Sequence, residues 1–135
     1  MRSPDFTHRL ARAALAVLVA AGGGCGEEPP AGPAPFSVSY AVSGVGAITI
    51  DSVKYDDGGG TLIKVTAPPA DWVVRLTVPA GGSVQAQAWG LATSPASAKL
   101  KVVWSRGGVD PGADSSFTST SGPGGVLLVI PPRQL

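Results

Sequence analysis

The residue types that most often carry enzymatic chemistry are almost absent from this chain of 135 residues. Its only cysteine is Cys25, and its only histidine is His8, which lies in a segment with the pattern of a signal peptide. The rest of the chain offers no histidine for a Ser-His-Asp triad, a Cys-His dyad or a typical zinc site. No phosphate-binding Gly-Lys-Ser/Thr loop occurs either. We therefore predict a protein that is not an enzyme and that uses no cofactor.

Carboxylates are the remaining candidates for chemistry. Asp56 and Asp57 are adjacent, and Asp51 stands five residues before the first of them. Aspartates followed by glycines favour turns, so the simplest interpretation is a hairpin turn that also adds solubility. A calcium site formed by these three residues is the alternative, although the spacing of an EF-hand is absent. Adjacent carboxylates in a turn would diverge, whereas a glycosidase needs two across a cleft.

Four other side chains are candidates for binding a partner. Lys99 and Lys101 alternate with apolar residues, so both point to the same side of one strand. Arg75 would join them if its strand were adjacent. A solvated face that discourages edge-to-edge pairing is the structural alternative for these three. Trp89 breaks the alternation of its own strand and is expected in the core or, alternatively, on an exposed binding surface.

The composition narrows the class of partner. The chain has 10 Lys and Arg against 9 Asp and Glu, a net charge of +1. Charged residues make up only 14%, against about 25% in an average soluble protein. This balance excludes a basic nucleic-acid-binding protein. A hydrophobic fraction of 44% argues against wholesale disorder.

Residues 1–24 have the pattern of a secretory signal. Three arginines, Arg2, Arg9 and Arg12, precede nine consecutive apolar residues at 13–21. Nine helical residues reach about 14 Å, less than half of the hydrocarbon core of a bilayer. A basic start, a short apolar run and small residues after it are typical of a signal peptide.

Cys25 directly follows this run and its glycines. Its placement resembles the lipobox of bacterial lipoproteins, in which the cysteine carries lipid and becomes the first residue. Gly24 fits that motif, whereas Gly22 stands where the motif usually has leucine. The resemblance implies anchoring to a membrane on the extracytoplasmic side of a bacterial cell envelope. The alternatives are ordinary cleavage, which would release a secreted domain, and an uncleaved anchor.

Residues 25–35 are expected to tether the domain to that anchor. This segment has four prolines and no aliphatic side chain larger than alanine. Proline fixes φ and removes a hydrogen-bond donor, so the segment favours an extended, solvated chain.

From Phe36 onward, apolar and polar residues alternate, which predicts β-strands. The phase of the alternation changes within 46–55 and predicts a bulge near Asp51 and Ser52. No stretch of this region shows helical periodicity. Seven strands at this spacing predict an immunoglobulin-like β-sandwich over 36–135, with a small barrel as the alternative. The strand-like runs are 36–42, 46–55, 61–66, 72–78, 83–88, 99–104 and 126–130.

Three further expectations concern burial and loops. The run 126–130 is apolar throughout, as in a strand that is buried on both faces. Residues 90–97 are small and polar, which predicts a loop. The segment 106–125 is too long for a loop without structure, so a strand is expected near 115–120 with Phe117 pointing inward.

Several short motifs resemble the extracytoplasmic domain of MmpS-type proteins, small mycobacterial membrane proteins that accompany MmpL lipid transporters. The resemblance covers about residues 36–130 in the correct order. It implies an immunoglobulin-like sandwich and supplies no catalytic residue. The family's cysteine pair is absent here. The motifs are Ala41-Val42-Ser43-Gly44, Val53-x-Tyr55-x-Asp57-x-Gly59, residues 82–88 and Ser121-Gly122-Pro123.

These patterns together predict a non-enzymatic lipoprotein of the cell envelope that displays one binding domain at a membrane surface. Its partner would be an envelope protein, glycan or lipid. An accessory protein of a lipid or efflux transporter is the alternative that the MmpS-like motifs suggest. A secreted structural domain is the third interpretation.

Overall fold

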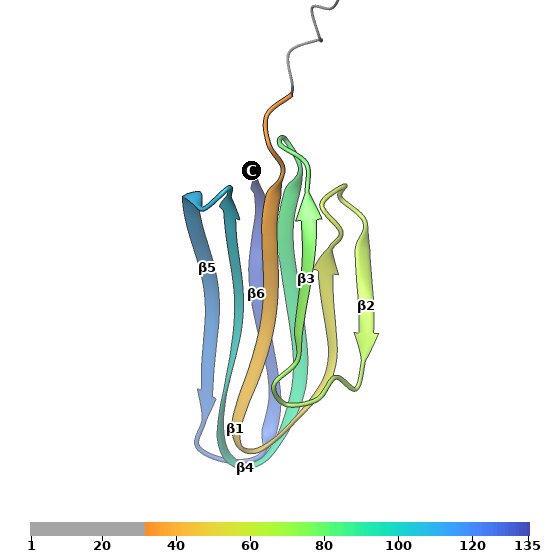
Figure 1. Ribbon diagram of the computed structural model, residues 1–135. Helices are drawn as coiled ribbons and strands as arrows, with labels where there is room; N and C mark the ends of the chain where they lie inside the picture. The colour runs from red at the N-terminus through yellow and green to blue at the C-terminus, as the bar shows by residue number, and fades with distance from the viewer. Residues whose placement is uncertain (1–31) are drawn as a thin grey trace, which may run out of the picture. The chain divides into compact units, whose positions relative to one another are not determined.

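Six β-strands and no helix make up residues 32–135, the part of the chain that the structure, a computed structural model, describes. All pairings are antiparallel and belong to one sheet (Figure 1). The predicted all-β class is therefore confirmed. The strands are β1 (Phe36–Asp56), β2 (Leu62–Thr66), β3 (Val73–Val78), β4 (Ser83–Arg106), β5 (Val109–Thr120) and β6 (Gly124–Gln134).

Positions 1–31 lie outside the described residues. The predicted signal peptide (1–24), the lipidation site at Cys25 and most of the predicted tether fall in this range. The compact unit that contains all six strands begins at Pro33 and ends at Leu135.

Two strands are much longer than the others, and each takes the place of two predicted strands. β1 has 21 residues and includes the runs 36–42 and 46–55, while β4 has 24 residues and includes 83–88 and 99–104. The predicted loop at 90–97 is wrong, because these residues remain in β4, which pairs with β1 on both sides of them. Small residues favour loops, but pairing with a neighbouring strand overrides that local preference.

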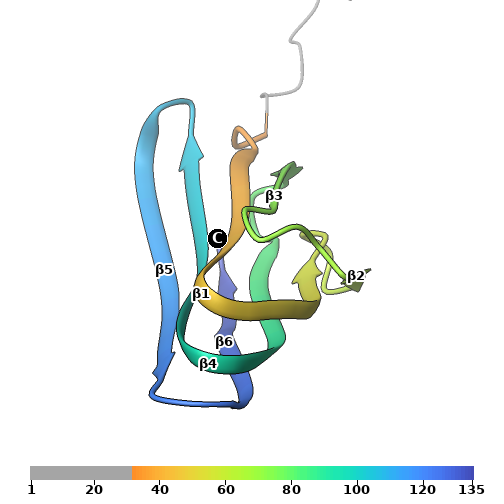
Figure 2. The ribbon, with the colours of Figure 1, turned by 90° about the horizontal axis from the view of Figure 1, so that it is seen from below.

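β1 and β4 both bend near their middles, so the sheet folds back on itself (Figures 1 and 2). We call one part the β5 half: β3, residues 36–46 of β1, residues 96–106 of β4, and β5. We call the other part the β6 half: β2, residues 48–56 of β1, residues 83–92 of β4, and β6. The strand order is β3-β1-β4-β5 in the β5 half and β2-β1-β4-β6 in the β6 half.

The bend depends on a close approach between the two long strands. Gly46 has a φ of +87°, and a Cβ there would lie 2.7 Å from the carbonyl oxygen of Pro95 on β4. Only glycine accepts both conditions without strain. The pairing register shifts between Gly46 and Ile48. Pro95 fits this irregular point because proline cannot donate a hydrogen bond to a regular ladder.

Apolar side chains from both halves meet in one buried core. Tyr40 and Leu100 come from the β5 half, and Val53, Val84 and Leu128 come from the β6 half; each is at most 1% exposed. Complete burial of a side chain of this size contributes about 1.5–3 kcal/mol to stability. Every second side chain of β1 and β4 points into the core, so these two strands line the inner surface of both halves.

The predicted bulge in β1 is confirmed. The register of the pairing with β4 shifts between Ile50 and Ser52, which leaves Asp51 as the extra residue. Ile50 and Val53 are both buried although they are three positions apart. Because Asp51 is extra, the side chain of Val53 points into the core again although the alternation has changed phase, as the sequence indicated.

β5 lies within the segment where a strand was predicted, but the predicted inward direction of Phe117 is wrong. Phe117 pairs with Lys99 and is 66% exposed. The neighbouring residue Ser116 pairs with the buried Leu100, so Ser116 occupies the inward position. The size of an aromatic side chain suggested burial, whereas the register with β4 decided its direction.

The prediction that residues 126–130 are buried on both faces is also wrong. Leu127 is 57% exposed and Val129 is 44% exposed, while Val126, Leu128 and Ile130 are buried. β6 therefore has one inner and one outer face. A continuous apolar run cannot distinguish this arrangement from a fully buried strand, because alternation is visible only when the outer residues are polar.

Candidate binding faces

Three of the candidate binding residues, Arg75, Lys99 and Lys101, lie on the outer face of the β5 half. Arg75 on β3 pairs with Ser39 of β1, and Lys101 on β4 pairs with Ala41 of the same strand. Paired residues share a face, and so do residues two positions apart on a strand. The structure thus brings the three basic residues to one surface, although β1 separates β3 from β4.

The outer face of the β5 half is positively charged and rich in hydroxyl groups. Lys99 and Lys101 are about 7 Å apart along β4, and Arg75 is two strands, about 10 Å, from β4. Backbone hydrogen bonds from Val42 to Trp72 and from Gly44 to Ala70 place one exposed acid, Asp71, opposite Ser43 at the edge of this face. The other outward positions whose side chains the structure describes carry neither Asp nor Glu. These positions are Ser37, Ser39, Ala41, Ser43, Val73, Thr77, Ser97, Val103, Ser105, Ala113, Ser115, Phe117 and Ser119.

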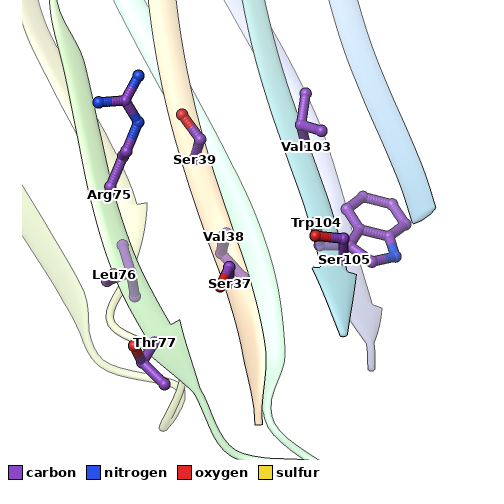
Figure 3. A pocket seen from close by; sticks show the side chains of 9 residues that line it. All are labelled: Ser37, Val38, Ser39, Arg75, Leu76, Thr77, Val103, Trp104 and Ser105. Carbon is purple, nitrogen blue, oxygen red and sulfur yellow. The ribbon is translucent and has the colours of Figure 1, made fainter. Parts of the chain in front are cut away.

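A shallow depression of about 390 Å³ lies on this face between β3 and β4 (Figure 3). Its floor is formed by the small side chains Ser37 and Ser39 of β1. Arg75 borders it on the β3 side and Val103 on the β4 side, since both residues pair with Ser39. The depression therefore offers hydroxyl groups beside one guanidinium group.

The fourth candidate, Trp89, is not near the other three. It lies on the outer face of the β6 half and is 47% exposed, so its placement in the core is wrong and the alternative of an exposed surface holds. Trp89 pairs with Ser52 on one side and with Leu127 on the other. Its indole ring covers Gly125, where an added Cβ would lie 2.8 Å from the ring.

The surroundings of Trp89 include residues that the sequence analysis did not name. Lys54 and Gln87 line a hollow of about 230 Å³ together with Trp89 and Leu127. Lys54 also pairs directly with Lys64 on β2. The turn predicted at Asp56 and Asp57 implies that the strands containing Lys54 and Lys64 are neighbours, whereas the register of β1 and β2 makes the two lysines direct partners.

Asp56 is the buried centre of the turn between β1 and β2. Its Oδ1 accepts hydrogen bonds from the backbone N–H groups of Gly58 (2.8 Å) and Gly60 (2.9 Å). Its Oδ2 accepts a hydrogen bond from the Ser83 hydroxyl at 2.5 Å, and its backbone carbonyl accepts one from the Tyr40 hydroxyl at 3.1 Å. Asp56 therefore connects the turn to the start of β4 and to the core.

These contacts also alter proton affinity. Burial is the largest influence on Asp56 and opposes its ionisation, but the hydrogen bonds from Ser83, Gly60 and Gly58 together outweigh it and lower the pKa of the carboxyl group. Burial and the nearby charge of Asp56 raise the pKa of Tyr40. The carboxylate is thus held in its charged form as an acceptor for turn donors.

The three aspartates of the calcium alternative are not brought together. Asp57 is exposed and accepts the backbone N–H groups of Gly59 and Thr61. Asp51 stands at the bulge, five residues or about 17 Å along β1 from Asp56. Within residues 32–135 no group of three His, Cys, Asp or Glu side chains is arranged to hold a metal ion. Asp56 and Asp57 act as turn residues.

Comparison with protein-family models, with curated proteins and with solved structures gives no match for this chain. Residues 32–135 include no helix that is long and apolar enough to cross a membrane.

Proposed function

We propose that this chain is a non-enzymatic lipoprotein of a bacterial cell envelope, which holds a β-domain at the extracytoplasmic surface of a membrane and binds an anionic partner. The observation that carries the proposal is the outer face of the β5 half. It gathers Arg75, Lys99 and Lys101, whereas Asp71 at its edge is the one exposed acid among its described outward positions. Cys25 supplies the anchor through its lipobox-like context.

The composition of this face supports binding rather than a purely structural role. After removal of residues 1–24 the chain would have 8 acidic and 7 basic residues, a net charge of −1. A surface with three positive charges and one negative charge at its edge therefore differs from the chain as a whole. Such local imbalance attracts partners of opposite charge and speeds their association. The bordering hydroxyl groups would accept and donate hydrogen bonds to a polar partner.

The experiment that tests the proposal measures binding of two anionic probes, polygalacturonate as a glycan and polyglutamate as an acidic peptide. The variant Arg75→Gln/Lys99→Gln/Lys101→Gln should bind the preferred probe about tenfold or more weakly, because each exposed charge pair contributes up to about 1 kcal/mol. Added salt should weaken wild-type binding. Lys54→Gln/Lys64→Gln is the comparison, since it removes charge from the other half and should weaken binding of the preferred probe less than the triple variant. Equal binding by wild type and the triple variant would contradict the proposed role of this face.

The finer fold that we propose is the immunoglobulin-like sandwich. Two halves of four strand segments each, packed on one core, support it. Residues from the MmpS-like motifs also meet in space. Val53 and Tyr55 of one motif pair with Ala88 and Ala86 of another. This clustering favours a second candidate function, an accessory protein of a lipid or efflux transporter.

A further inference from the structure

The outer face of the β6 half carries an apolar patch beside a pair of lysines. Trp89, Leu91, Leu127 and Val129 are each between 44% and 57% exposed. They lie on β4 and β6, which pair side by side, with Trp89 directly opposite Leu127. They form one continuous surface rather than scattered exposed residues, and surfaces of this kind mark interaction sites.

Lys54 and Lys64 occupy directly opposite positions on β1 and β2, next to this patch. Like charges in opposite positions destabilise a sheet. No ion pair joins either lysine to an acid among the residues that the structure describes. The nearest acid on the same strand, Asp56, is two residues from Lys54, but its carboxylate is buried and accepts hydrogen bonds from Gly58, Gly60 and Ser83. Because the lysine pair does not stabilise the fold, binding of an anionic partner outside the domain would explain why two lysines stand opposite each other.

The two kinds of residue meet in one place. The hollow of about 230 Å³ has the Lys54 side chain at one side and Trp89 with Leu127 at the other. Tryptophan is enriched where a bilayer meets water, because its ring is apolar and its indole N–H is polar. Lysines beside it would lie at the depth of anionic headgroups. This combination fits an anionic bilayer surface.

The length of chain between the proposed anchor and β1 permits such contact. Residues 25–36 span at most about 40 Å when fully extended. The first half of β4, from Ser83 to the bend, measures about 30 Å. A lipid on Cys25 would therefore keep the domain close enough for any part of this face to reach the membrane.

We propose that the outer face of the β6 half docks on the anionic surface of the membrane in which the chain is anchored. Trp89 and Leu127 enter the interface between headgroups and acyl chains, while Lys54 and Lys64 contact anionic headgroups. The inference rests on the proposed lipid anchor. It leaves the basic outer face of the β5 half available to a partner away from that bilayer.

The test uses protein purified from the membranes of an expressing bacterium and reconstituted into vesicles of equal parts phosphatidylcholine and phosphatidylglycerol. Bromine atoms on the acyl chains quench tryptophan emission at short range. Comparison of wild type with Trp89→Phe isolates the contribution of Trp89 from those of Trp72 and Trp104. We expect the Trp89 emission to shift to shorter wavelength and to be quenched by brominated lipid.

Paired variants separate the two faces. Lys54→Gln/Lys64→Gln should lower the ratio of docked to undocked domain about 25-fold, or about fivefold for each lysine near an anionic surface. Lys99→Gln/Lys101→Gln removes the same charge from the β5 half, so it measures the effect of net charge alone and should lower the quenching less than Lys54→Gln/Lys64→Gln. All four lysines lie at exposed positions, so the variants should keep the fold.

The outcomes distinguish docking from anchoring. Unquenched Trp89 in anionic vesicles, or equal loss of quenching in both lysine variants, would overturn docking even if the intact mass shows lipid on Cys25. A mass without lipid, together with quenching when vesicles are added to the protein, would overturn the anchor and leave docking supported. A shift of Trp89 emission with polyglutamate but not with vesicles would assign the face to an acidic protein instead.

Discussion

At the scale of single residues, Asp56 shows how one side chain stabilises both a turn and the core. Its carboxylate accepts two backbone N–H groups from the turn and the hydroxyl of Ser83 from β4. Tyr40, which is fully buried, donates to its backbone carbonyl. Loss of this carboxylate would leave buried donors without partners, which costs more than the net value of the hydrogen bonds themselves.

We therefore expect Asp56→Ala to lower the free energy of unfolding by about 3 kcal/mol at neutral pH, as measured by urea denaturation. Asp57→Ala is the matched control, because Asp57 makes similar hydrogen bonds at the exposed side of the same turn. Its effect should stay below about 1 kcal/mol. Equal effects of the two substitutions would show that Asp56 has no special role.

Asp56 also predicts a dependence of stability on pH. Its pKa is lower in the folded protein than the value of about 3.9 that an unfolded chain gives. A group of this kind stabilises the fold above its unfolded pKa, and the stabilisation disappears as the pH falls through the folded pKa. The stability difference between wild type and Asp56→Asn should thus be largest near neutral pH and shrink below about pH 4. A difference that is constant from pH 7 to the acid range would contradict the lowered pKa.

At the scale of elements, the bend in β1 and β4 allows each of these strands to contribute one segment to the β5 half and one to the β6 half. Gly46 contributes a φ of +87° and a close approach to the backbone of Pro95. Gly81 has a similar φ of +81°, but nothing lies within 4 Å of the position of its absent Cβ. The two glycines thus share the conformational requirement and differ in packing.

Gly46→Ala should consequently be more destabilising than Gly81→Ala. A positive φ at a residue with a side chain costs about 1–3 kcal/mol, and the contact with Pro95 adds to this only at position 46. Thermal unfolding followed by far-UV circular dichroism measures the change in melting temperature of both variants. Equal melting temperatures of the two variants would show that the bend tolerates a wider separation of β1 and β4.

At the scale of the whole molecule, the proposal assigns different partners to the two outer faces. The β5 half presents Arg75, Lys99 and Lys101 to a soluble or envelope partner. The β6 half presents Trp89 with Lys54 and Lys64 to the bilayer. An anchor at Cys25 would favour the second contact, because a tethered surface meets the membrane at a high effective concentration.

The anchor itself is testable by mass and by partitioning. Wild type should carry acyl chains on a chain that begins at Cys25 and should partition into detergent or membranes, since two or three acyl chains bind a bilayer stably. Cys25→Ala should remain in the aqueous fraction. A processed chain that starts near Gly22 with a free thiol would overturn the lipoprotein proposal and favour a secreted binding domain. Co-purification of a large transporter with the lipidated protein would favour the accessory function.

The sequence by itself determined the properties that depend on neighbours along the chain. Alternation from Phe36 onward predicted an all-β domain, and the phase change at Asp51 predicted the bulge. The Asp-Gly-rich segment after Tyr55 predicted the turn. Each of these signals is local, because side-chain direction in a strand follows from position alone.

Only the tertiary structure decided which surfaces are covered and which residues meet. Phe117 and Trp89 are large and apolar, but pairing registers with β4 turn both outward. Pairing on either side of β1 brings Arg75 to the face of the two β4 lysines, and the β2 register sets Lys64 opposite Lys54. These outcomes depend on long-range pairing, and a shift of one residue in register would reverse every side chain of a strand.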